Sequence, residues 1–410
     1  MTGFGRALRT EFLLEDGYTP LNHGSFGVCP KSIRQYLQHY QLLSELNPDK
    51  FLRLEMFPLL QKNKNRLAEL LQCDPNELVF VINASSGINA VVRSLMLRPN
   101  EKLLCFSTAY DAVEKTLHYV QDAHQAELIP IQLNYPMSDD TILEIIQQTI
   151  VQHHLPSSPI KLCVMDAITS VPGVRFPFER VVKLLKEYDI LSLVDGAHAI
   201  GQIPLDLHQI DPDFFVTNCH KWLFTPRGAA ILYVPRRNQY MIHPTIINAA
   251  YQNHPDSQRN DDVSTAFQLE FSWPGTMDFS SFMCIEHALD FRETLGGEEK
   301  IQQYCHQLAV DGGRLVSEIL GTNVMENEEN SLTVAMVNVR LPLNPHERYS
   351  GQEVVQAIIS KLLYEHNCMG SPFLHNNTWY VRLSAQVYTD MEDFEVIGKA
   401  LLKVCQELEQ

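Results

Sequence analysis

The sequence predicts an α/β protein with a large domain on a mostly parallel, doubly wound sheet and a small C-terminal α+β domain. Short apolar runs alternate with amphipathic segments over residues 78–234, which indicates parallel strands with helices on both faces of the sheet. From residue 331 the order changes to strand, helix, strand and helix. At 410 residues the chain is also too long for a single compact core.

We therefore expect an N-terminal arm that packs partly on the small domain, followed by the two domains, with the boundaries 1–30, 31–295 and 296–410. Leucines recur at helical spacing in residues 58–72, and residues 31–46 have the same spacing. Residues 243–268 are polar and weakly periodic, which indicates irregular structure.

Composition excludes several classes of protein. The formal net charge is −17 and Lys and Arg form no basic cluster, whereas nucleic-acid binding requires concentrated basic side chains. No apolar run approaches the roughly 20 residues of a membrane span, so we expect neither nucleic acid nor membrane as a partner. The nine cysteines include no C-x-x-C pair, and no secretory leader is evident. We expect reduced, mostly buried thiols, no metal site and a cytoplasmic location.

A strand, a hydroxyl-rich turn and a helix follow one another after residue 77. The apolar run is followed by Asn83-Ala84-Ser85-Ser86-Gly87 and then by an apolar helical segment. The first amides of a helix have no internal partner and lie at the positive end of its dipole, so such a turn can bind a phosphate. A helix-capping serine would give the same letters. We assign Ser85 and Ser86 to a phosphate group.

The later strand-like runs also end beside polar residues. One leads to Tyr110, and another ends on Asp166, with Thr169 and Ser170 just beyond it. Because the carboxyl ends of parallel strands lie along one edge of a sheet, a site is expected there.

The central runs carry the most informative residues. One ends on Asp195 and the next on Asn218, followed by His220 and Lys221. Lys221 stands between His220 and Trp222, where a solvated surface lysine is not expected. A structural ion pair between Asp195 and Lys221 is the simplest alternative to a catalytic pair.

Burial would make the side-chain amine of Lys221 a better nucleophile. A lysine in an apolar site has its charged form disfavoured, so the neutral amine becomes accessible. A neutral amine is the nucleophile of Schiff-base chemistry. An acid nearby can keep a pyridinium nitrogen protonated, as in sites for pyridoxal 5′-phosphate (PLP). Asp195 and Lys221 together therefore predict a PLP site, with Lys221 as its catalytic residue.

The chain resembles the class V aminotransferase group of fold-type I PLP enzymes, which includes cysteine desulfurases, isopenicillin-N-epimerase-like proteins and kynureninase. The resemblance rests on the motifs Asp195-Gly196-Ala197-His198 and Asn218-Cys219-His220-Lys221-Trp222, and on residues 21–27, 172–179, 224–228 and 381–388. It extends from about residue 10 to near the C-terminus, and it implies the fold-type I PLP-dependent transferase fold.

The resemblance also implies roles for individual residues. Tyr110 would stack on the pyridine ring and act as an acid. Ser170, or its neighbour Thr169, would lie near the phenolate oxygen. The other cofactor-binding residues would be Ser85, Ser86, Asp195, His198, Asn218, His220 and Lys221. A core tyrosine is the alternative for Tyr110.

Contacts with the substrate and with a second subunit are implied as well. In related dimers the threonine of the Gly275-Thr276 element reaches the cofactor phosphate of the neighbouring subunit, which implies a homodimer with shared active sites. A helix-capping turn would explain Thr276 equally. A buried Arg without a nearby acid requires an anion, and Arg382 would hold the substrate α-carboxylate, although an Arg solvated at a sheet edge is the alternative. Asn22 and His23 would lie on the substrate side, although a plain turn is the alternative.

Within this group the chain is most similar to the hercynylcysteine sulfoxide lyases of fungal ergothioneine biosynthesis. That similarity implies β-elimination on hercynylcysteine S-oxide, which yields a sulfenic acid, pyruvate and ammonia. A cysteine desulfurase stays open, because Cys368 precedes Arg382 roughly where such enzymes carry their sulfur acceptor, although an ordinary thiol is simpler. An epimerase or another tailoring enzyme of secondary metabolism would share every cofactor residue. A catalytically silent binding protein is disfavoured by Lys221, Asp195 and Arg382.

Overall fold

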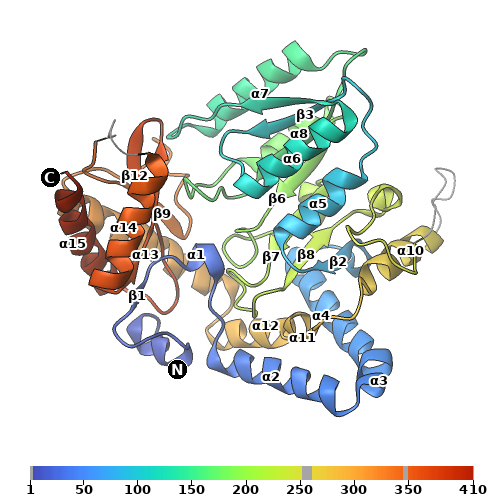
Figure 1. Cartoon of the computed structure of the whole chain (residues 1–410), viewed down its shortest axis with the longest axis horizontal. Helices are drawn as coiled ribbons and strands as arrows, with labels where there is room; N and C mark the ends of the chain where they lie inside the picture. The colour runs from blue at the N-terminus through green and yellow to red at the C-terminus, as the bar shows by residue number, and fades with distance from the viewer. Residues whose placement is uncertain (1–2, 252–260, 345–349, 410) are drawn as a thin grey trace.

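The computed structural model describes residues 3–251, 261–344 and 350–409. Its large domain contains a seven-stranded sheet in the order β2-β8-β7-β6-β5-β3-β4 (Figure 1). These strands are β2 (Leu78–Val81), β3 (Lys102–Phe106), β4 (Glu127–Ile131), β5 (Ile160–Asp166), β6 (Leu191–Asp195), β7 (Phe214–Asn218) and β8 (Ala230–Tyr233). β8 is antiparallel to both of its neighbours, and the remaining pairs of this sheet are parallel. The expected mostly parallel sheet is confirmed.

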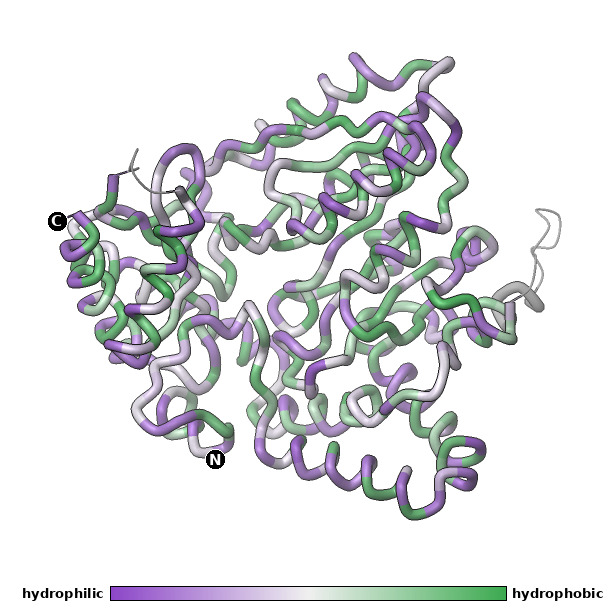
Figure 2. The backbone as a smooth tube through the Cα atoms, viewed as in Figure 1, coloured by the Kyte–Doolittle hydropathy of each residue, from purple (hydrophilic) through white to green (hydrophobic). Residues whose placement is uncertain are grey.

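Helices cover both faces of this sheet because its buried strands point successive side chains to opposite sides. Leu103 and Cys105 of β3 belong to one apolar cluster, whereas Leu104 and Phe106 belong to another. The first cluster includes residues of α5 (Ala84–Ser94), α6 (Asp111–His124) and α10 (Asp261–Ser272). The second includes residues of α2 (Lys31–Leu46), α4 (Met56–Leu71), α7 (Asp139–His153), α8 (Phe178–Lys186) and α12 (Ile285–Thr294). Figure 2 shows hydrophobic residues concentrated along the central strands.

Short helices complete the arm and the large domain. The arm contains a 3-10 helix at Arg6–Glu11 and α1 (His23–Phe26). The large domain contains α3 (Pro48–Lys50), α9 (Leu207–Ile210) and α11 (Ser280–Met283), 3-10 helices at Pro75–Glu77 and Arg236–Met241, and a π-helical turn at Phe51–Glu55. α10 corrects the expectation of irregular structure for residues 261–268, whereas residues 252–260 of that stretch lie outside the described residues. Its apolar residues Phe267 and Phe271 are buried against the sheet, so tertiary packing stabilises a helix whose sequence periodicity is weak.

The small domain has a three-stranded antiparallel sheet in the order β11-β12-β9. Its elements are α13 (Glu298–Leu320), β9 (Met336–Arg340), α14 (Gly351–His366), β10 (Cys368–Met369), β11 (Ser371–His375), β12 (Thr378–Ser384) and α15 (Met391–Leu408). The arm reaches this domain, because β1 (Thr19–Pro20) pairs in parallel with β10. In Figure 1, α1 lies between the small domain and the large sheet.

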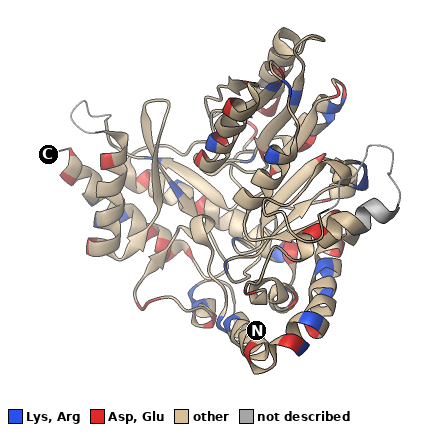
Figure 3. Cartoon of the chain, turned by 45° about the vertical axis from the view of Figure 1, so that its right-hand side comes forward, with Lys and Arg blue, Asp and Glu red and all other residues tan. Residues whose placement is uncertain are grey.

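Charged residues of both signs are interspersed along the helices (Figure 3). Within the described ranges, no helix is both long and apolar enough to cross a membrane. The same residues contain no group of three His, Cys, Asp or Glu side chains arranged to hold a metal ion.

Candidate active site

Three adjacent strands bring the expected catalytic residues to one edge of the large sheet. β5 ends on Asp166 and β6 ends on Asp195, and these two residues pair across the parallel strands. β7 pairs with β6 and ends on Asn218, so Lys221 follows in the next turn. Both carboxyl groups are buried, and the charge of Lys221 acts on both of them. Asp195 and Lys221 are thus neighbours, as expected.

His198 holds the side-chain amine of Lys221. Lys221 Nζ lies 3.2 Å from His198 Nε2, and Trp222 Nε1 donates to His198 Nδ1 at 3.2 Å. Since an indole nitrogen only donates, Nδ1 must accept, and a neutral His198 therefore carries its proton on Nε2. That proton can be accepted only by the lone pair of an uncharged amine. The hydrogen-bond pattern thus favours neutral Lys221.

Burial and the charge of a neighbouring side chain also favour the neutral form of Lys221. Burial lowers the pKa of Lys221 to about 8, and the positive charge of Arg382 adds to this effect, while Asp195 and Asp166 oppose it. Burial also lowers the pKa of His198 well below its usual value. At pH 7 about a tenth of Lys221 is therefore an uncharged nucleophile, a far larger fraction than for a solvated lysine.

Arg292 fixes the loop that carries Lys221. This fully buried side chain donates to the carbonyl oxygens of Trp222 at 2.7 Å and Gly201 at 3.0 Å, and it forms an ion pair with Glu298. Gly201 is required there, because a Cβ atom at that position would lie 2.7 Å from the Trp222 carbonyl oxygen. The loop is therefore held by a side chain of α12.

The two acids at the strand ends differ in their surroundings. Asp195 Oδ1 accepts from the backbone N–H of Ala197 at 2.9 Å, and burial raises the pKa of Asp195. Burial, and then the charge of Asp195, raise the pKa of Asp166 well above its usual value. Two buried carboxyls beside one lysine are not both ionised without a large free-energy penalty. A pyridinium nitrogen at Asp195 would supply a second positive charge. From the sequence we assigned no role to Asp166, although it ends a buried strand as Asp195 does.

The expected phosphate site lies at the N-terminus of α5. Asn83 caps this helix, since its Oδ1 accepts from the Ser86 N–H at 2.8 Å and from the Ser86 hydroxyl at 2.9 Å. Asn218 Oδ1 accepts from the Ala84 N–H at 2.9 Å and so ties β7 to the helix. Ser85 and Ser86 occupy the first turn and are partly exposed. The positive end of the helix dipole therefore faces an accessible site.

The loop after β3 presents an aromatic ring. Tyr110 precedes the first residue of α6, and its side chain is 51% exposed. In the same loop the hydroxyl of Thr108 is buried, and no residue in the described ranges is its hydrogen-bond partner.

His220, expected to bind the cofactor, forms a hydrogen bond within the protein instead. Its Nδ1–H donates to the Ala229 carbonyl at 2.9 Å, and burial lowers its pKa to about 4.

Arg382 is buried and has only neutral partners. Its Nη1 donates to the Ser170 carbonyl at 2.7 Å, and its Nη2 donates to Asn22 Oδ1 at 2.9 Å and to Ser25 Oγ at 2.8 Å. Its Nε has no partner within the described part of the chain, and burial lowers its pKa to about 10. Gly173 provides the space, because a Cβ atom there would lie 2.7 Å from Arg382 Cδ.

Thr169 and Ser170 of the β5 loop differ in their contacts within the protein. Thr169 donates its hydroxyl to the Pro172 carbonyl at 2.5 Å and is buried. Ser170 is less buried, and both its carbonyl and its hydroxyl face Arg382. The structure thus brings Ser170 to the guanidinium group, while Thr169 is committed to its own loop.

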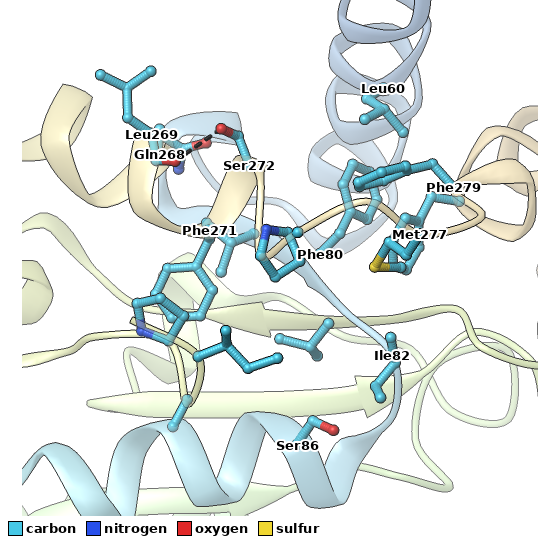
Figure 4. A pocket seen from close by; sticks show the side chains of 18 of the residues that line it. Leu60, Phe80, Ile82, Ser86, Gln268, Leu269, Phe271, Ser272, Met277 and Phe279 are labelled. Atoms are coloured by element: carbon cyan, nitrogen blue, oxygen red, sulfur yellow. Dashed lines mark hydrogen bonds between the residues drawn. The ribbon is translucent and has the colours of Figure 1, made fainter. Parts of the chain in front are cut away.

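Thr276 lies apart from Lys221, beside an apolar pocket of about 590 Å³. Leu60, Phe80, Ile82, Phe271, Met277 and Phe279 line this pocket, and Ser86 reaches it from α5 (Figure 4). Thr276 is exposed. The pocket therefore joins the expected phosphate helix to the Gly275-Thr276 element at the molecular surface.

The residues present fit PLP. A buried lysine with an accessible neutral amine, a buried carboxyl that lacks a full counter-charge, and a helix N-terminus match the aldehyde, the pyridine nitrogen and the phosphate of this cofactor. The orphaned Thr108 hydroxyl provides one further donor.

The chain belongs to the aminotransferase class V family, whose model matches residues 30–396. It is 32% identical over 405 residues to a hercynylcysteine sulfoxide lyase of Schizosaccharomyces pombe, covering 98% of each chain. It is 25% identical to an L-cysteine desulfhydrase of Arabidopsis thaliana, covering 96% of this chain and 89% of that protein.

Solved structures agree on the fold. A variant of C-DES with glycine covalently linked to its PLP cofactor superimposes with a TM-score of 0.78 at 16% identity, covering 96% of this chain and 98% of that one. The expected family, fold, PLP cofactor and lyase class are confirmed. The roles of individual site residues stay predictions.

Proposed function

We propose that this PLP-dependent lyase cleaves the carbon–sulfur bond of hercynylcysteine S-oxide by β-elimination. The observation that carries the proposal is Arg382: a buried guanidinium that, within the described residues, is bonded only to neutral oxygens and whose charge acts on Lys221. A substrate α-carboxylate would supply its missing anion. The relative from Schizosaccharomyces pombe supports the choice of substrate.

In this proposal each side chain has one task. PLP supplies the electron sink that makes the Cα proton acidic. Arg382 and Asn22 hold the carboxylate, Asp195 holds a positive charge at the pyridine nitrogen, and Lys221 removes the Cα proton. The Cβ–S bond then breaks, the sulfur leaves with the bonding pair as a sulfenate, and Tyr110 protonates it. Water converts the remaining three-carbon fragment to pyruvate and ammonia.

A cysteine desulfurase would require a mobile, exposed thiol. Cys368 is instead buried in β10, where it pairs with Thr19 of the arm, and burial raises its pKa to about 12. A thiolate is the nucleophile in sulfur transfer, so this environment disfavours that reaction. Cys368→Ala should accordingly leave turnover within about twofold of wild type.

A substrate panel tests the proposed reaction. The purified holoenzyme is given hercynylcysteine S-oxide, L-cysteine or L-cystine, and pyruvate is measured. We expect stoichiometric pyruvate from the S-oxide and little from cysteine, because a sulfenate is the better leaving group. Alanine and persulfide from cysteine would establish a desulfurase, and racemised substrate without pyruvate would establish an epimerase.

The cytoplasmic location of the protein stays a prediction.

A further inference from the structure

The arm residue His23 joins the lysine loop to the small domain. Its Nε2 lies 2.9 Å from the carbonyl oxygen of Lys221, and its Nδ1 lies 2.7 Å from the hydroxyl of Tyr388. Since a carbonyl oxygen only accepts, Nε2 carries the ring proton, and Nδ1 accepts from Tyr388. The ring is 3% exposed and lies 5.2 Å from the ring of Trp222. Both nitrogens are therefore committed to the protein in one tautomer.

The surroundings of His23 keep it in that state. Burial lowers its pKa to about 4, with smaller contributions in the same direction from Arg292, Arg227 and Lys221. Tyr388 is itself buried, so water does not compete with His23 for its hydroxyl group. The arm backbone also abuts the lysine loop, because a Cβ atom at Gly27 would lie 1.9 Å from the His220 carbonyl oxygen.

We propose that His23 is a positioning residue for Lys221: oriented by Tyr388, it fixes the backbone from which the catalytic amine projects. This role differs from the substrate contact expected from the sequence, since no ring nitrogen is left for a substrate. Asn22, one residue earlier, accepts from Arg382, so a single short segment fixes both the amine and the guanidinium. The inference rests on the proposed function only for the catalytic role of Lys221.

Two substitutions separate the two hydrogen bonds of the ring. In His23→Gln the side-chain amide nitrogen reaches the place of Nε2 and keeps the bond to Lys221, while the bond to Tyr388 is lost. In His23→Asn the amide oxygen takes the place of Nδ1, so the Tyr388 bond is kept and the Lys221 bond is lost. Tyr388→Phe removes only the orienting hydroxyl. His208→Asn, on an exposed histidine of α9, is the control.

The readout is the reactivity of Lys221 in the apoenzyme, which needs no substrate and is independent of the reaction catalysed. The protein is labelled with acetic anhydride between pH 6 and pH 10, and the peptide that carries Lys221 is quantified by mass spectrometry. Wild type and His208→Asn should be half-labelled near the pKa of about 8. In His23→Asn the midpoint should rise by about one pH unit, because a displaced amine is better solvated. The rate at which added PLP binds, followed by its absorbance, should fall about tenfold.

His23→Gln should keep the wild-type labelling midpoint, and Tyr388→Phe should shift it by less than His23→Asn does. Each histidine variant loses one hydrogen bond, so both should lower the melting temperature by similar amounts. A merely structural role would then move both labelling curves equally, which would overturn the proposal. An unchanged midpoint in His23→Asn would overturn it as well. Failure of the lyase assay with normal labelling behaviour would count against the proposed function alone.

Discussion

Burial gives Lys221 and Arg382 different properties. The ammonium group of Lys221 loses its charge readily when it is buried, and the His198 ring is arranged to bond the neutral amine. The guanidinium group of Arg382 keeps its charge even with a pKa of about 10, so it remains a permanent anion receptor. One residue can therefore exchange protons, while the other keeps the charge that the proposed carboxylate contact requires.

Replacing the lysine tests the first of these roles. Lys221→Ala should abolish the absorbance of lysine-linked PLP and lower turnover by about 100- to 10,000-fold, because the base for the Cα proton is lost. Lys102 provides a matched control, since it is also buried, yet it begins β3 and so lies at the end of the strand away from the site. Lys102→Gln should retain the absorbance. Retention of the band in Lys221→Ala would refute the assignment.

Replacing the arginine tests the second role. Arg382→Lys keeps a positive charge but loses the planar fork, so KM for the S-oxide should rise by about 10- to 100-fold, in line with the loss of a charged hydrogen bond. The exposed Arg340 on the neighbouring strand β9 is the control, and Arg340→Lys should leave KM unchanged. An unaltered KM in Arg382→Lys would show that the carboxylate binds elsewhere.

For single residues, the sequence predicted which side chains form the site better than it predicted their hydrogen-bond partners. Asp195 and Lys221 could be predicted because each ends or follows a buried strand. The partners of His23 could not, since Lys221 and Tyr388 lie 198 and 365 residues away. The orphaned hydroxyl of Thr108 and the bond from Ser25 to Arg382 depend on side-chain placement that no local pattern records.

At the scale of elements, the carboxyl groups that end β5 and β6 are close enough for the charge of one to raise the pKa of the other. Asp166 and Asp195 are paired by strand register, and both have pKa values raised by burial. An acid whose pKa is higher in the folded state than in the unfolded state destabilises the fold once pH exceeds its unfolded value. This penalty grows as pH rises from about 4 and levels off above the folded pKa.

Asp166→Asn should therefore stabilise the apoenzyme at neutral pH. Urea unfolding at pH 7.5 should show a free energy of unfolding higher than that of wild type by about 1 kcal/mol or more, and the gain should vanish below about pH 4. Asp122→Asn, at an exposed position of α6, should show no such pH-dependent gain. A loss of stability that is the same at every pH would contradict the prediction.

Elements were predictable where periodicity is strong. The alternating strands and helices between residues 78 and 234 appear as expected, because burial on both faces imposes long apolar runs. α10 was missed because it is stabilised by contacts with the sheet rather than by its own pattern. The sequence offered a serine as the capping alternative, whereas Asn83 caps α5 in the structure, and the contact between Asn218 and α5 required the fold.

At the scale of the molecule, the apolar pocket beside Thr276 is the surface that we propose a second copy of the chain covers. Exposed apolar side chains, including Phe57, Ile82 and Leu269, border it. Apolar surface of this kind is characteristic of interfaces, and it continues to the helix expected to bind the cofactor phosphate. The proposed homodimer would therefore place Thr276 of one subunit near the site of the other.

Mixing two impaired variants tests this arrangement. Thr276→Val should weaken PLP retention, measured by dialysis and absorbance, because a hydroxyl contact to the phosphate is lost. A mixture with Lys221→Ala should regain activity through hybrid dimers that contain one intact site, approaching a quarter of the wild-type level in a random equimolar mixture if each site acts independently. Subunit exchange is checked with differently tagged chains. No recovery despite exchange would argue against shared sites.

The link between the arm and Arg382 has a consequence for biogenesis. Asn22 and Arg382 are 360 residues apart, and β1 needs β10 as its partner. Ribosomes add about 5 to 20 residues per second, so the arm waits about 20 to 70 s for the strand that completes the site. During that interval the lysine loop has emerged without its small-domain support. Tight capture of the cofactor should accordingly begin only after β12 has been synthesised, and chains truncated before this strand should not carry the cofactor.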